Sequence, residues 1–178
     1  MLRRISVLAL VALLSLPTCG FASKSHSIDS VQALQHDGDT FCTTFSINEE
    51  EGYWATAAHC ATHAMDKDVT IMGQAAHIVF IGFPSADIAV FQSLATAPAL
   101  KLATKAVPQC IPSQMECEPI HIIGYPYGIA RTTTRGWMGS RNIAITHPST
   151  GYYMTCDILD VTVAGGNSGS PVLNNEKV

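Results

Sequence analysis

The chain has 178 residues, of which 47% are hydrophobic and 13% are charged, and this balance excludes a disordered or solvating chain. Its formal net charge of -4 at pH 7, with no basic run beyond Arg3-Arg4, excludes the positive patch that nucleic-acid binding needs. A chain of this length is typical of a single domain that buries a core of its own.

The first 22 residues are typical of a secretory signal peptide. Residues 1–4 supply a positive start, residues 5–16 form an apolar stretch, and residues 20–22 include small side chains for cleavage. The apolar stretch is shorter than the roughly 20 residues of a membrane-spanning helix, so we expect a secreted or periplasmic protein without stable membrane insertion. Two alternatives are an uncleaved anchor and a lipoprotein that carries its lipid on Cys19. All three hypotheses take the chain out of the cytoplasm.

Export affects the interpretation of the cysteines, because thiols outside the cytoplasm tend to pair. After the predicted signal peptide the chain contains Cys42, Cys60, Cys110, Cys117 and Cys156. This odd number leaves one thiol without an internal partner. The only close histidine pair, His59 and His63, is four residues apart, but no glutamate follows His59 and no third ligand is evident. We therefore expect neither a metal site nor another cofactor.

The rest of the chain shows short apolar or alternating runs separated by turn residues, a pattern typical of an all-β protein. Helical periodicity is weak, with the exception of Ile28–Leu34 and a turn after His59. A polar hairpin loop at residues 48–52 separates the first two strands. In chain order, the predicted strands are Phe41–Ile47, Tyr53–Ala57, Val69–Met72, Ala76–Phe80, Ile88–Gln92, Ile120–Ile123, Arg131–Met138, Tyr152–Asp157 and Pro171–Leu173.

A connector divides these strands into two β units. Between residues 95 and 118 the strand pattern is lost and three prolines occur. We therefore expect one domain over residues 23–178. Its first unit covers about 40–95, the connector about 96–118, and the second unit about 119–178.

Three short segments carry residue types that catalysis uses: TAAHC at 56–60, DIAV at 87–90 and GGNSGSP at 165–171. His59 follows a predicted strand. An imidazole ordinarily has a pKa of about 6.5, which suits a general base at neutral pH. Asp87 precedes an apolar strand, where its carboxylate can orient an imidazole. Glycines on both sides of Ser168 permit close approach of a substrate and allow successive backbone N–H groups to point at one place.

In chain order these residues are His, Asp and Ser, which is the order of the chymotrypsin triad. With the motifs TAAHC, DIAV and GNSGSP, the chain resembles the chymotrypsin/trypsin-fold serine proteases from about residue 41 to its C-terminus. The wording DIAV, the asparagine of GNSGSP and the segment IGYPYG at 123–128 are most similar to bacterial trypsin-like peptidases, including the high-temperature-requirement proteases. The resemblance implies two six-stranded antiparallel β-barrels with the active site in the cleft between them.

The resemblance also implies a role for each site residue. His59 becomes the general base, Asp87 its orienting partner and Ser168 the nucleophile, while the backbone N–H groups of Gly166 and Ser168 form the oxyanion hole. It further implies a disulfide between Cys60 and Cys42.

The pairing of the remaining cysteines stays open. A bond between Cys110 and Cys117 leaves Cys156 without a partner, whereas a bond between Cys117 and Cys156 leaves Cys110 without one.

The sequence also departs from the digestive proteases. Asn167 stands where those enzymes carry the acid that captures a freshly cut N-terminus, so we expect no activation by that ion pair. Thr162 stands at the specificity-pocket position where trypsins carry an acid, which favours a small or uncharged side chain at the cleaved position. Only residues 169–178 follow Ser168, so we expect the second barrel to be incomplete and the chain to be truncated relative to the family.

Three hypotheses for function follow from these residues. The first is an exported serine endopeptidase that cleaves a polypeptide substrate through an acyl-enzyme. The second is a catalytically silent homologue that binds peptides or partner proteins. The third is an esterase for non-peptide substrates on the same scaffold.

Overall fold

The computed structural model describes residues 26–101, 103, 106–111, 117–146, 151 and 153–174. The predicted signal peptide at 1–22 and the alternative lipidation site at Cys19 lie outside these residues. Within the described part, no helix has both the length and the apolar character that crossing a membrane requires.

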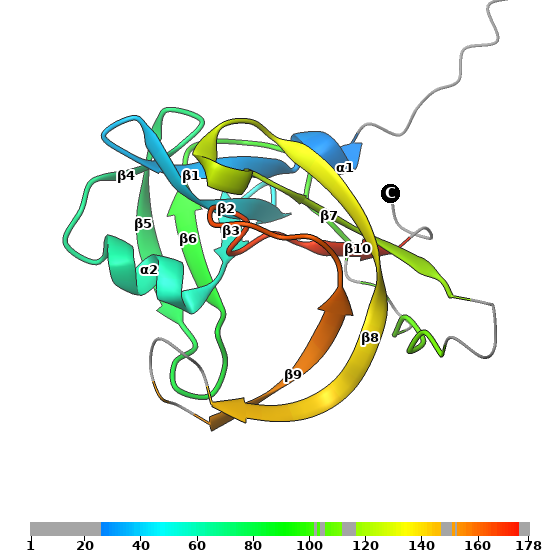
Figure 1. Cartoon of the computed structure of the whole chain (residues 1–178). Coiled ribbons are helices and arrows are strands. Elements are labelled where there is room, and N and C mark those ends of the chain that lie inside the picture. Colours follow the sequence, from blue (N-terminus) through cyan, green and yellow to red (C-terminus); the bar gives the residue numbers. More distant parts are fainter. Residues whose placement is uncertain are drawn as a thin grey trace, which may run out of the picture.

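A closed barrel of six antiparallel strands forms the first unit (Figure 1). A short helix, α1 (His26–Asp29), precedes it, and a second helix, α2 (Ala58–Ala64), follows the third strand. Around the barrel the order is β1-β2-β3-β6-β5-β4. The strands are β1 (Val31–His36), β2 (Asp39–Asn48), β3 (Tyr53–Thr56), β4 (Val69–Ile71), β5 (Gln74–Ile81) and β6 (Ala89–Ser93).

Large apolar side chains from the strands and small ones from α2 fill the barrel. The largest buried side chains of this core are Leu34, Trp54, Ile71 and Phe91. The Trp54 ring nitrogen donates a hydrogen bond to the backbone oxygen of Ala95 at 3.2 Å, so the indole is buried with its polar atom satisfied. The alanines of α2 are buried in the same core, and their small size lets the helix lie close to the strands.

The helical stretch expected at 28–34 is helical only at residues 28–29, the end of α1, and from Val31 onward the prediction was wrong because β1 takes its place. Val31 and Leu34 are both fully buried, and their spacing of three imitates the helical period. In a strand, residues three apart point to opposite faces. Accordingly Leu34 packs in the barrel core, while Val31 packs in a second cluster on the other side of the strand.

The second unit is a four-stranded antiparallel sheet with the order β10-β7-β8-β9. Its strands are β7 (Pro119–Gly124), β8 (Thr132–Thr146), β9 (Tyr153–Asp160) and β10 (Val172–Asn174), and a short 3-10 helix, η2 (Pro126–Gly128), follows β7. Figure 1 shows β8 as a long, strongly curved strand in a wide arc, with β9 beside its lower part. The first unit is therefore the closed six-stranded barrel that we expected. In the second unit the described strands form an open, curled sheet of four strands.

All the predicted strands coincide with observed ones, β2 to β10. The main difference is length. β8 continues to Thr146, past the predicted end at Met138, and its pairing with β9 shifts register twice over that stretch. Each irregularity interrupts the alternation of faces by which a strand is recognised in a sequence.

Two disulfides occur among the described residues. Cys42 is bonded to Cys60, as the resemblance implied, and Cys110 to Cys117. Cys156 on β9 is a free thiol. Of the pairings that the sequence left open, the structure therefore contains the one within the connector.

An apolar cluster joins the two units. Val31, Ile123 and Leu173 are buried together, with Phe45 and Leu100 packed against them. These side chains come from β1, β7 and β10, together with β2 and the connector. The cluster therefore holds β7 and β10 of the sheet against β1 and β2 of the barrel.

Candidate active site

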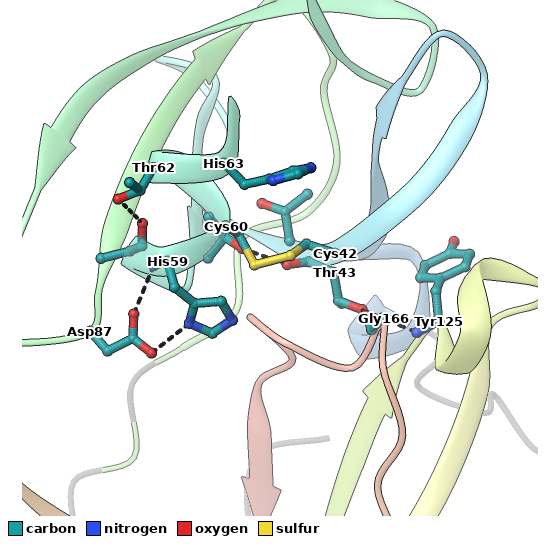
Figure 2. The surroundings of a disulfide bond; sticks show 12 residues. Cys42, Thr43, His59, Cys60, Thr62, His63, Asp87, Tyr125 and Gly166 are labelled. Atoms are coloured by element: carbon teal, nitrogen blue, oxygen red, sulfur yellow. Dashed lines mark hydrogen bonds and ion pairs between the residues drawn. A yellow bond between two sulfur atoms is a disulfide. The ribbon is translucent and has the colours of Figure 1, made fainter. Parts of the chain in front are cut away.

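His59 and Asp87 are held together by two hydrogen bonds at one edge of the barrel (Figure 2). His59 lies in the first turn of α2, just beyond β3, and Asp87 lies in the loop between β5 and β6. Asp87 Oδ2 lies 2.8 Å from the ring nitrogen His59 Nδ1, and Asp87 Oδ1 accepts a bond from the backbone N–H of His59 at 2.9 Å. The side chains are 34% and 23% exposed.

This double contact fixes both the position and the orientation of the imidazole. One carboxylate oxygen holds the backbone, and the other holds the ring. When Nδ1 carries the proton and donates it to Asp87, the neutral ring has its lone pair on Nε2. The pair predicted from the sequence is therefore assembled with the geometry in which an imidazole can accept a proton.

The loop that presents Asp87 is tightly closed. The backbone N–H of Gly82 donates to the oxygen of Ile88 at 2.7 Å, and the Ser85 hydroxyl donates to the oxygen of Gly82 at 2.8 Å. A Cβ on Gly82 would lie 2.9 Å from the backbone oxygens of both Ala86 and Ile88. Only glycine fits there without moving the loop, so this turn fixes the position of the carboxylate.

The disulfide between Cys42 and Cys60 lies directly beside the pair, because Cys60 follows His59 in the chain (Figure 2). It links α2 to β2. Ligand-type atoms of Cys42, His59 and Cys60 lie within 4.8 Å of one another. Metal binding by cysteine needs a thiolate, and both sulfurs are engaged in the disulfide.

The segment around Ser168 forms a tight loop between β9 and β10. Gly166 and Gly169 have φ values of +91° and +85°, which favour glycine. A Cβ on Gly169 would collide with the Thr56 hydroxyl and with the backbone oxygen of Thr43. Because Gly169 has no side chain, the loop can pack against β2 and β3, next to the start of α2. This packing brings the half-buried Ser168 to the barrel edge that carries His59.

The N–H groups of Gly166 and Ser168 have fixed directions. Each belongs to a peptide unit whose carbonyl is hydrogen-bonded: Gly165 O accepts from Tyr127 N at 2.5 Å, and Asn167 O accepts from Ser170 N at 2.9 Å. In a trans peptide the N–H points opposite to the C=O. These bonds therefore orient the two N–H groups that the resemblance names as oxyanion donors.

Thr162 and Asn167 occupy different surroundings. Thr162 is exposed, in the irregular stretch between β9 and the Ser168 loop. Asn167 is half-buried, and its side-chain oxygen lies 2.5 Å from the place where a Cβ on Gly124 would be.

One buried residue at the site, Thr43, was not singled out from the sequence. Its hydroxyl donates to Gly166 O at 2.8 Å and accepts from Tyr125 N at 3.0 Å. The available signal was weak: a threonine pair, residues 43–44, stands directly after Cys42 inside the predicted strand Phe41–Ile47.

Comparison with known proteins gives a family and a fold. The profile described as the trypsin-like peptidase domain matches residues 42–178. No curated protein sequence matches the chain.

Among solved structures, the chain is similar to the inactive form of the Rv3671c protease of M. tuberculosis H37Rv, with 20% identity, a TM-score of 0.66 and coverage of 85% of this chain and 76% of that one. For an HtrA-type protease with tripeptide the identity is 20%, the TM-score 0.62 and the coverage 84% and 48%. For the MamO protease domain from Magnetospirillum magneticum the values are 15%, 0.65, 85% and 82%. At these identities the likeness shows the fold, a chymotrypsin-like double-barrel arrangement.

Proposed function

The chain belongs to the trypsin-like peptidase domain family, and from this premise we propose that it is an exported serine endopeptidase with the triad Ser168, His59 and Asp87. The observation that carries the proposal is the contact of Asp87 with both the ring and the backbone of His59. A carboxylate that holds a histidine in this way is the orienting half of a Ser-His-Asp triad. The fold and the family support the nucleophile, because the GNSGSP loop packs against the same barrel edge.

The proposed chemistry begins with Ser168. Its hydroxyl oxygen attacks the carbonyl carbon of the scissile peptide, while His59 Nε2 takes the hydroxyl proton. The tetrahedral intermediate then collapses: the C–N bond breaks, His59 returns the proton to the leaving amine, and the acyl group stays on Ser168. Water attacks the acyl-enzyme with His59 again as the base, and the carboxylic acid and free Ser168 are released. Asp87 stays ionised and stabilises the imidazolium.

The negative oxygen of the intermediate needs donors that are already in place. We assign this role to the N–H groups of Gly166 and Ser168. The bonds from Tyr127 N and Ser170 N to the neighbouring carbonyls support the assignment, because the donors need no reorientation during the reaction. One such donor ordinarily contributes about 3 kcal/mol to transition-state stabilisation.

Export forms part of the proposal. We propose that residues 1–22 are a signal peptide and that residues 23–178 act in the periplasm or outside the cell. The two disulfides are compatible with an oxidising compartment.

The first barrel begins earlier in the chain than residue 40, the start expected from the sequence, because β1 starts at Val31 and belongs to the closed barrel. The segment at residues 23–40 therefore contains a strand of the barrel, and cutting it off as a propeptide would open the barrel.

The proposed substrate is a polypeptide with a small or uncharged side chain at the cleaved position. The neutral Thr162 at the specificity position supports this preference. The neutral Asn167 before the nucleophile supports a site that needs no ion pair with a new N-terminus.

A second candidate function is peptide binding without turnover. It is favoured by the open second sheet, in which β9 and β10 are edge strands among the described residues. Apolar side chains such as Trp137, Ile158 and Val172 are exposed in this sheet, at 38%, 44% and 47%.

An esterase on the same scaffold is the third hypothesis. A panel of ester and peptide substrates distinguishes it from the endopeptidase.

A fluorophosphonate probe tests the proposed function directly, because it labels only a serine that a base activates. We expect intact-mass spectrometry of the purified chain to show a single adduct, and the same chain to cleave an unstructured polypeptide. Ser168→Ala removes the adduct and the cleavage, whereas Ser140→Ala, a change on β8 outside the site, keeps both. A folded wild-type chain that binds peptides without adduct or cleavage supports the second function, and an adduct that persists in Ser168→Ala overturns the first.

A further inference from the structure

All the polar atoms of Thr43 are hydrogen-bonded, and two of these bonds go to the Ser168 loop. It lies on β2 and is fully buried. Its backbone N–H donates to Ser168 O at 2.8 Å, and its backbone oxygen accepts from the Thr56 hydroxyl at 2.7 Å. Its own hydroxyl donates to Gly166 O and accepts from Tyr125 N (Figure 2).

The hydroxyl joins three parts of the chain that are far apart in sequence. Thr43 belongs to the first barrel, Tyr125 follows β7 of the second unit, and Gly166 belongs to the Ser168 loop. A hydroxyl has one proton to donate and two lone pairs to accept with. Thr43 uses the proton on the loop and a lone pair on the second unit, so a single oxygen connects both units to the loop.

We propose that the Thr43 hydroxyl is a positioning group that holds the oxyanion loop, residues 165–170, in its working conformation across the two units. The proposal rests on the proposed function, since it deepens the role of Gly166 as an oxyanion donor. Thr43 itself is not placed in contact with substrate. It acts through the peptide units that it holds.

Gly166 shows why this hydroxyl matters. The peptide unit before Gly166 is held by Tyr127 N at Gly165 O, and the unit after it is held by the Thr43 hydroxyl at Gly166 O. A Cβ on Gly166 would collide with the backbone oxygen of Tyr125, so this backbone lies directly against the segment after β7. With its φ of +91°, Gly166 has the conformational freedom that only glycine has, and the two flanking bonds remove that freedom.

Loss of the hydroxyl leaves two polar groups without their partner, Gly166 O and Tyr125 N. Groups of this kind move toward water or toward other partners, because burial without a hydrogen bond is unfavourable. We expect the loop to open more often and the Gly166 N–H to be displaced more easily, because its own peptide unit keeps the bond from Tyr127 N but the unit after Gly166 is no longer held. The barrel around β2 keeps its other contacts.

Thr44 provides a matched control for the experiment. It is the next residue on β2, is also fully buried, and its hydroxyl donates to Ala55 O at 2.9 Å, within the first barrel. Thr43→Val and Thr44→Val therefore each remove one buried threonine hydroxyl at nearly constant volume. Thr43→Ser restores the hydroxyl at the first position. Only the changes at Thr43 alter the connection to the loop.

Two readouts are needed. The first is amide hydrogen exchange of peptides that cover residues 165–170, measured by mass spectrometry, which reports on the loop whether or not the chain is active. The second is the rate of labelling by the fluorophosphonate, accompanied by kcat and KM on a peptide substrate. We expect Thr43→Val to speed exchange in the loop and slow labelling, each by about tenfold to a hundredfold as loss of a buried bond predicts. The fall should be in kcat rather than KM, and Thr43→Ser should restore most of it.

The outcomes separate this inference from the proposed function. If the wild-type chain takes no label, the proposed function fails, and the exchange rates alone decide whether Thr43 holds the loop. The inference is overturned if Thr43→Val and Thr44→Val have the same rate of hydrogen exchange in the loop and the same rate of labelling by the probe. It is also overturned if Thr43→Val and Thr43→Ala do not fold while Thr44→Val does, because the hydroxyl then serves folding rather than the placement of the loop.

Discussion

At the scale of single residues, the sequence predicted the groups that motifs single out and missed the group whose role depends on the fold. His59 and Asp87 were predicted as a pair, and the structure brings them into contact. Thr43 was missed because the partners of its hydroxyl, Tyr125 and Gly166, are 82 and 123 residues away in the chain. A contact over such a distance leaves no local pattern, and threonine is common on strands because its branched side chain suits them.

Asp87→Asn tests the orienting carboxylate. The amide cannot accept a bond at both of its ends, so it cannot hold the backbone N–H and the ring N–H of His59 together. We expect the rate of fluorophosphonate labelling to fall by roughly four orders of magnitude, as for the corresponding change in a known triad. The exposed Asp66 offers a control, Asp66→Asn, that keeps the wild-type rate. A fall of less than tenfold at Asp87, in a folded chain, would contradict the proposed role.

Gly169→Ala tests the close approach of the Ser168 loop to the barrel. Gly73 is a matched position, since its φ of +74° is also positive but nothing lies within 4 Å of a Cβ there. Both substitutions carry the backbone cost of a positive φ, about 1 kcal/mol. Only Gly169→Ala also pushes the loop away from Thr43 and Thr56.

Urea unfolding and probe labelling distinguish the two glycine variants. We expect Gly73→Ala to lose some stability and keep full labelling. Gly169→Ala should lose more stability and most of its labelling. Equal effects of the two changes on both measurements would mean that the loop does not depend on this contact.

At the scale of elements, the strands were predicted well because each alternates or is short and apolar between turns. β1 was the exception, since it is buried on both faces and its two buried residues belong to different clusters. The curl of the β8–β9 hairpin could not be predicted either, because the register shifts within it depend on the partner strand.

The two disulfides constrain different elements, and their loops differ in length. Cys42 and Cys60 are separated by 18 residues and tie α2 to β2, whereas Cys110 and Cys117 are separated by 7 residues within the connector. The chain-entropy relation predicts that removal of the first bond by paired Ala substitutions costs about 3 kcal/mol and removal of the second about 2 kcal/mol.

We expect the two disulfide variants to differ more in their rate of probe labelling than in their free energy of unfolding. Loss of the first bond frees the helix turn that carries His59, so probe labelling should fall. Loss of the second leaves labelling unchanged. The measurements are urea unfolding under oxidising conditions and the labelling rate, and a larger functional effect from the connector bond would refute the assignment of the site.

At the scale of the whole molecule, the two units share a cluster and a hydrogen-bonded residue. Val31, Ile123 and Leu173 meet between the units, and Thr43 contacts both. The family could be predicted from the sequence, but these contacts between the units, called the joint below, could not. The four residues that form the joint lie on four different strands, and no motif contains them all.

The joint predicts that the two units unfold together. Trp54 lies in the barrel core and Trp137 lies on β8, so each tryptophan reports on one unit. In Trp54→Phe and Trp137→Phe variants we expect fluorescence to give coincident urea midpoints, the mark of one cooperative transition. Ile123→Ala removes packing at the joint and should cost about 2–5 kcal/mol. Two separate midpoints in a chain with an intact joint would contradict this prediction.

The order of the strands along the chain sets the order in which the site can be completed. All six strands of the closed barrel, together with His59 and Asp87, precede residue 94, whereas the loop with Ser168 comes only after β9. As the polypeptide is synthesised from its N-terminus, the proposed base and its carboxylate can be assembled before the proposed nucleophile has been made. Under the proposed chemistry, the growing chain cannot cleave polypeptides until the loop with Ser168 has folded onto the barrel.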